Sequence, residues 1–90
     1  MSKLEKMMAF LNDEEIALVE KCMANESFRK EFKELSPDGA AREIIMNIVI
    51  HHYIGQDRAG IITDEEDQRW TDIQNKAYEL GILERKRFSR

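Results

Sequence analysis

The chain has 90 residues, enough for one small domain, and its 42% hydrophobic and 36% charged content is typical of a folded globular protein. A formal net charge of −4 disfavours general nucleic-acid binding, which needs a basic face. One proline and four glycines disfavour a fold with many strands and turns, and the single Cys22 excludes an internal disulfide. These features favour an all-α protein.

Helix starts are marked along the chain by capping boxes, in which a short polar side chain precedes a glutamate by three residues. They are Ser2 with Glu5, Asn12 with Glu15, and Thr63 with Glu66. Ser36-Pro37 marks a further start, because proline is tolerated at the first helical position. We predict about five helices, at residues 3–11, 13–24, 26–35, 37–54 and 64–80.

Apolar side chains recur every three or four residues within each predicted helix, which places these stripes in the core. The stripe of residues 26–35 consists of Phe28, Phe32 and Leu35. The last helix is expected to end at Gly81, with Ile82 packing behind it.

Residues 37–54 are expected to form a central helix that is apolar on nearly every side, because only Glu43, Asn47 and His51 form a polar strip. The fold class is therefore an all-α compact bundle of about five short helices around this helix. We expect residues 1–83 to form a single helical domain, followed by a basic tail at residues 84–90.

A small bundle has few helices with which to cover such a central helix. The side chains furthest from the centre of its main apolar face are therefore predicted to form an interface. They are Met46, Ile50, Tyr53 and Ile54. A homo-oligomer, most simply a dimer, would cover them.

His51 and His52 are adjacent, so they point about 100° apart and are not expected to bind one metal ion together. We interpret His51 as a solvated residue and His52 as a neutral core residue. No metal site, no cofactor and no catalytic residue is predicted, since no nucleophile–base pair or further metal ligand accompanies them.

A second group of side chains has the chemistry of a small anionic ligand site, because aromatic rings stack on bases and guanidinium groups bind phosphate. It consists of Tyr53, Arg58, Arg69, Trp70 and Lys76. A nucleotide is the example that this chemistry favours. The simpler interpretation is that Trp70 is a large core residue and that Gly55–Gly60 is a plain connector.

The N-terminal residues are too charged for a signal peptide and no segment has the length of a membrane span, which favours a cytoplasmic protein without membrane contact. Nucleic-acid binding is unlikely except through the tail from Arg85 to Arg90. The leading hypothesis is a small non-catalytic adaptor or inhibitor that acts by occupying another protein. The alternative is sequestration of an anionic ligand such as a nucleotide.

Overall fold

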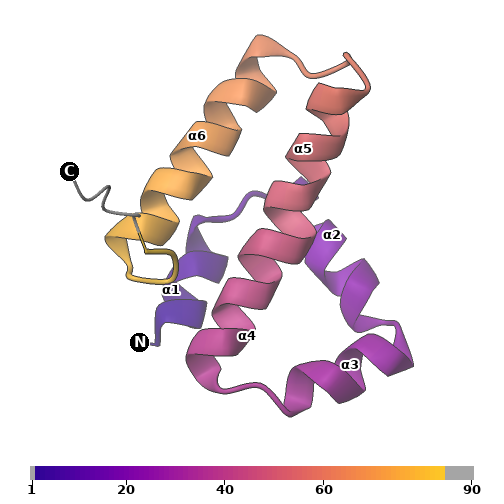
Figure 1. The fold of residues 1–90 in the computed structure, drawn as a ribbon, viewed down its shortest axis with the longest axis vertical. Helices are drawn as coiled ribbons and strands as arrows, with labels where there is room; N and C mark the ends of the chain where they lie inside the picture. The colour runs from indigo at the N-terminus through magenta and orange to yellow at the C-terminus, as the bar shows by residue number, and fades with distance from the viewer. Residues whose placement is uncertain (1, 85–90) are drawn as a thin grey trace, which may run out of the picture.

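The structure is a computed structural model that describes residues 2–84, and within this range every regular element is a helix. The elements are α1 (Lys3–Phe10), α2 (Asp13–Met23), α3 (Glu26–Lys33), α4 (Pro37–Glu43), the π-helix η1 (Ile44–Ile50), α5 (His51–Arg58) and α6 (Asp64–Glu79). Because α4, η1 and α5 follow one another without a break, they form one long central helix (Figure 1). The predicted all-α bundle of five helices is confirmed.

The helix starts lie where the capping residues predict them. Each of the three capping boxes is formed, and in the second one Asn12 and Glu15 exchange bonds of 2.9 Å in both directions. The Ser36 hydroxyl accepts from the backbone N–H of Gly39, and Pro37 occupies the first turn. Short-range polar bonds therefore fix where four of the helices begin.

The last helix ends in a Schellman motif at Gly81, whose φ of 75° lies in the left-handed region. The N–H of Ile82 donates to the carbonyl of Ala77 at 2.9 Å, and the N–H of Gly81 donates to that of Tyr78 at 3.1 Å. Ile82 is buried behind the turn, as predicted.

The predicted end of the central helix is wrong, because the helix continues past residue 54 to Arg58. Gly55 was taken as the start of a loop, but a single glycine inside a helix costs only about 1 kcal/mol and does not stop it. The chain leaves the helix at Gly60, where φ reaches 72° and the N–H of Ile61 donates to the carbonyl of Gln56. Most of the predicted 55–60 connector is thus helical.

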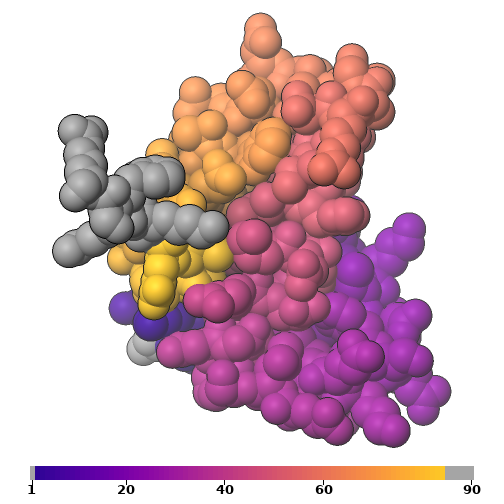
Figure 2. All heavy atoms as spheres, viewed as in Figure 1, coloured from indigo at the N-terminus to yellow at the C-terminus, as the bar shows by residue number. Residues whose placement is uncertain are grey.

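The core lies where the central helix meets α1, α2 and α6 (Figure 1). Ile45 and Val49 on the central helix are fully buried, together with Met7 of α1 and Ile73 of α6. The central helix is nevertheless not wrapped on all sides. In Figure 2 its atoms reach the surface between α6 and the pair formed by α2 and α3.

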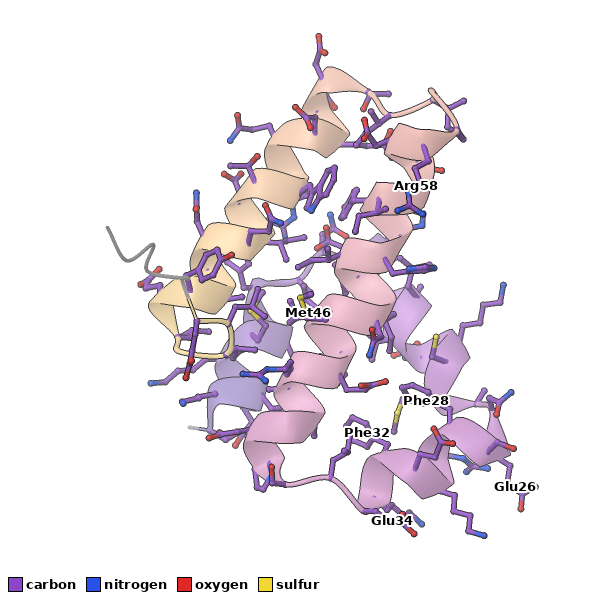
Figure 3. All side chains as sticks on the ribbon, in the orientation of Figure 1. Glu26, Phe28, Phe32, Glu34, Met46 and Arg58 are labelled. Carbon is purple, nitrogen blue, oxygen red and sulfur yellow. The ribbon has the colours of Figure 1, made fainter. Side chains whose placement is uncertain are left out.

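The helix α3 stands at the edge of the bundle and contributes no fully buried side chain. Phe28 and Phe32 are half-buried and point toward the central helix, whereas Glu26 and Glu34 point away from it (Figure 3). Leu35 is 40% exposed, so its assignment to the core was wrong. The phase of the stripe was predicted correctly, but α3 has a neighbour on only part of its apolar face.

Candidate functional site

An ionic cluster centred on Glu15 joins three helices inside the bundle. The Glu15 side chain is only 1% exposed. Arg69 of α6 donates to it through Nε and Nη2, at 3.0 Å to Oε2 and 2.8 Å to Oε1, and the hydroxyl of Tyr53 on α5 donates to Oε2. Arg69 Nη2 also donates to the carbonyl of Phe10 at 2.7 Å, and the guanidinium lies 4.6 Å from the centre of the Phe10 ring. Both carboxylate oxygens are thus bonded, and Glu15 connects α2 to α5 and α6.

The electrostatics of this cluster favour its charged form. Burial raises the pKa of Glu15, but the hydrogen bonds from Arg69, Tyr53 and Asn12 lower it by more, so the pKa lies below the usual value. The pKa of Tyr53 is raised by burial and by its bond to the Glu15 carboxylate. The bond to Glu15 raises the pKa of Arg69. Glu15 and Arg69 therefore form an ion pair in which both carboxylate oxygens are hydrogen-bonded.

Sequence reasoning missed this cluster because its members are 38 and 54 residues apart along the chain. Glu15 was interpreted only as a capping glutamate, and its Oε1 does accept from the Asn12 N–H. The sequence did contain one indication that Glu15 is buried. Glu15 lies four residues before the buried Val19, so the two side chains fall on the same side of α2.

The predicted anion-binding residues are not gathered around one free space. Arg69 and Tyr53 do meet, but through the Glu15 carboxylate, which takes the position that a ligand phosphate would need. Lys76 lies 5.6 Å from the Phe10 ring and pairs with Glu79 at 3.6 Å. Arg58 is exposed on the opposite flank of α5 from α6 (Figure 3).

Trp70 is half-buried, and its indole N–H is buried without a hydrogen-bond partner in the described chain. This agrees with its interpretation as a large residue that packs against the core. An unpaired buried N–H costs free energy.

The predicted interface residues divide into buried and exposed members. Ile50 and Tyr53 are 2% and 5% exposed, so the chain itself encloses them and neither offers surface to a partner. Ile54 is half-buried, and Met46 is 41% exposed on the side of the central helix that faces α6 (Figure 3). The predicted homo-oligomer stays a prediction, with Met46 as the exposed member of the set.

The burial of Ile50 has a physical cause in the π-helix. Hydrogen bonds in a π-helix run between residues five apart, instead of four, so each turn holds more residues. Each residue therefore rotates the chain by less than 100°, and side chains late in η1 lag behind their positions on an α-helical wheel. Ile50, the last residue of η1, falls closer to the buried face than the wheel indicated.

An open groove with a volume of about 610 Å³ lies between α2, α3 and the central helix. Apolar side chains from all three elements line it, and polar side chains surround them. The lining residues are Leu18, Lys21, Cys22, Asn25, Ser27, Phe28, Glu31, Asn47, Ile48, His51 and His52. The groove exists because α3 is held at the edge of the bundle and leaves part of the central helix uncovered.

A smaller hollow of about 90 Å³ continues this groove toward the start of the central helix. It shares Phe28 and Glu31 with the groove and adds Phe32, Leu35 and Glu43. The amide of Asn47 donates to the Glu43 carboxylate at 2.7 Å, which holds that carboxylate at the edge of the hollow. The two adjoin at Phe28 and Glu31 and run along the central helix from Glu43 to His52, with a mainly apolar lining in the larger one and a mixed lining in the smaller one, and together we call them the α3 groove.

His52 lines the α3 groove and is half-exposed, so its assignment to the core was wrong. Its ring meets that of Tyr53 edge to face, with 5.3 Å between centroids. His51 is exposed, as predicted. The side of the central helix on which His52 lies is apolar, but α3 does not extend far enough along the helix to cover it.

Among residues 2–84, no three His, Cys, Asp or Glu side chains are grouped closely enough to hold a metal ion. In the same range, no helix combines the length and the apolar character that a bilayer crossing requires. The tail residues Arg85 to Arg90 lie outside the described residues. Comparisons with protein-family models, with curated proteins and with solved structures found no match for this chain.

Proposed function

We propose that this protein is a non-catalytic binding protein that acts by occupying another protein, and that the α3 groove receives an amphipathic helix of that partner. The observation that carries the proposal is the groove itself, which is concave, mainly apolar, bounded by three helices and about 610 Å³ in volume. Apolar grooves between helices are a recurrent receptor for the apolar face of a partner helix.

The dimensions of the α3 groove favour a helix as its occupant. From Glu43 to His52 the central helix advances nine residues, or at most roughly 13 Å at the α-helical rise of about 1.5 Å per residue, since the π-helical part rises less. A partner helix that presents apolar residues at positions i, i+3, i+4 and i+7 needs about 10.5 Å. The half-buried Leu18 and Phe28 then supply apolar walls for those side chains, and the buried Ile48 lies beneath them at the floor.

The remaining chemistry of the chain supports binding over catalysis. Glu15 and Tyr53, whose pKa values are respectively lowered and raised, bond to each other, and Glu15 also bonds to Arg69. Arg69, the main cation of the alternative nucleotide site, already binds the Glu15 carboxylate, which disfavours that alternative. The groove presents an apolar surface bordered by polar side chains, which suits the binding of an amphipathic segment.

The proposal is tested by placing a photo-crosslinking amino acid at Ser27, which is exposed and lines the groove, in cells that express the protein. The matched position is Asn75, which is exposed on α6 away from the groove. We expect Ser27 to crosslink a protein segment that Asn75 does not crosslink, and the sequence of that segment to show an amphipathic helical pattern. A synthetic peptide of the segment should then shift the NMR signals of Leu18, Phe28 and Ile48.

Two variants separate groove binding from a general loss of folding. Ser27→Trp fills the groove without burying a charge and should weaken peptide binding at least tenfold. Met46→Glu changes an exposed apolar residue outside the groove and should leave binding unchanged. The proposal fails if the Ser27 position crosslinks only a second copy of this chain, or if the peptide binds with its shifts elsewhere.

A further inference from the structure

The polar groups that border the α3 groove differ between its two ends. Lys21 and the imidazoles of His51 and His52 line the main groove and not the smaller hollow, whereas Glu43 lines only the hollow, which Glu31 also borders. We infer that the partner helix received by the groove carries opposite charges at its two ends, with carboxylates over Lys21 and the histidines and with basic residues over Glu31 and Glu43. This inference rests on the proposed function, since it specifies the partner of the same groove.

The basic end has free donors that suit a carboxylate. The ion pairs among residues 2–84 are Lys3–Asp38, Arg69–Glu15 and Lys76–Glu79, so no described acidic residue neutralises Lys21 within 4 Å. Lys21 is exposed at the C-terminal turn of α2, and it offers three N–H donors. The imidazoles of His51 and His52 each offer a further donor from the facing helix.

The acidic end has acceptors that suit an ammonium or a guanidinium group. Glu31 on α3 and Glu43 on the central helix stand on opposite walls of the smaller hollow, with Phe28 and Phe32 between them. Glu43 already accepts from Asn47, and this bond leaves its second oxygen open to a partner. Within the described chain Glu31 has no cationic partner within 4 Å.

The charges on the outer face of α3 do not disturb this order. Arg29, Lys30 and Lys33 lie with Glu26 and Glu34 on the far side of the helix, in a mixed set of three cations and two anions. At physiological ionic strength charges beyond about 8 Å are largely screened, so the groove-lining charges dominate for a helix lying in the groove. The charge order therefore selects which way a partner helix lies.

Two designed peptides test the inference. Both are 14 residues long, with leucine at positions spaced i, i+3, i+4 and i+7. One carries glutamates on the polar face of its first half and lysines on that of its second half, and the other carries the reverse order. A spin label at the N-terminus of each peptide broadens the NMR signals of the groove residues that lie near it.

We expect the direction of binding to follow charge and not chain direction. The label should broaden Lys21 and His52 when the glutamates come first, and Glu31 and Glu43 when the lysines come first. The double variant Lys21→Glu/Glu31→Lys should abolish the preference for one direction in both peptides, because Glu43 keeps its negative charge beside the new cation at position 31. Its matched control, Lys33→Glu/Glu34→Lys, exchanges charges on the outer part of α3 and should leave both patterns unchanged.

The expected affinity change is modest, because the charges are exposed. One exposed ion pair changes affinity by about 1.4- to 5-fold. A peptide that lies with like charges at both ends of the groove should therefore bind roughly 2- to 25-fold more weakly than the same peptide in the opposite direction. If both peptides lie in the same direction, apolar contacts set the orientation and the inference is wrong while the proposed function stands. If neither peptide shifts any groove signal although a crosslinked natural segment does, the charge order is also wrong. If the natural segment fails too, the proposed function falls with it.

Discussion

Removing Arg69 should destabilise the protein more than its half-exposed position suggests. Arg69→Met keeps an unbranched apolar stem, but it removes the guanidinium over the Phe10 ring together with its bonds to Glu15 and to the Phe10 carbonyl. The Glu15 carboxylate is then left 1% exposed with only Tyr53 and the Asn12 N–H as donors. Leaving one member of a buried ion pair without its partner costs about 3–5 kcal/mol.

This cost is a large part of the total. A domain of this size has a free energy of unfolding of about 5–14 kcal/mol, at roughly 0.05–0.15 kcal/mol per residue. Urea unfolding at pH 7, followed by circular dichroism, measures the change directly as a shift in the midpoint at constant slope.

The double variant Glu15→Met/Arg69→Met distinguishes an ion pair from simple packing. Because it removes both charges, it should be more stable than Arg69→Met alone, apart from the lost cap of α2. Glu5→Gln, at the equivalent position of the exposed first capping box, measures what such a cap is worth. The reasoning is refuted if Arg69→Met costs less than about 1 kcal/mol, or if the double variant is less stable than the single one.

Three further predictions concern the same interior and surface. The pKa of Glu15 is lowered in the folded protein, so its stabilisation is present above the unfolded value of 4.5 and should be lost as pH falls through the folded value. Urea unfolding between pH 7 and pH 3 should therefore show a larger loss of stability in wild type than in Glu15→Met/Arg69→Met, which keeps other carboxylates such as Glu66. Ile50→Glu should unfold the chain by burying a charge, whereas Met46→Glu should change the free energy of unfolding by no more than about 0.5 kcal/mol. A folded Ile50→Glu protein would contradict the burial of Ile50. Light scattering of Met46→Glu beside wild type tests the predicted homo-oligomer. Nucleotides should leave Trp70 fluorescence unchanged, because Glu15 already binds Arg69, and a saturable change would revive the ligand hypothesis.

The sequence was informative wherever the determining interaction is local. The capping residues Asn12 and Thr63 bond to backbone groups three residues away, so the starts of α2 and α6 could be predicted closely. Gly81 and Ile82 likewise predicted the end of α6 from contacts within one turn. Local hydrogen bonds depend on spacing alone, and spacing is visible in the sequence.

Prediction was poorer wherever the outcome depends on which surfaces meet. Nothing near Glu15 in the chain indicates that Arg69 will reach it from 54 residues away. The position of Ile50 depends on the π-helix, which an α-helical wheel does not include. Leu35 and His52 belong to correct apolar stripes, but the length and placement of α3 leave them partly uncovered. The α3 groove could not be predicted for the same reason.

The peripheral position of α3 also affects how the groove moves. A helix with no fully buried side chain can separate from the bundle at a lower free energy than global unfolding, since the core of Met7, Ile45 and Ile73 stays intact. Backbone amides of α3 should therefore exchange hydrogen faster than those of α6. If a partner helix binds there as proposed, it would largely set the width of the groove, and helices with leucine or with bulkier aromatic side chains would fit on an unchanged core.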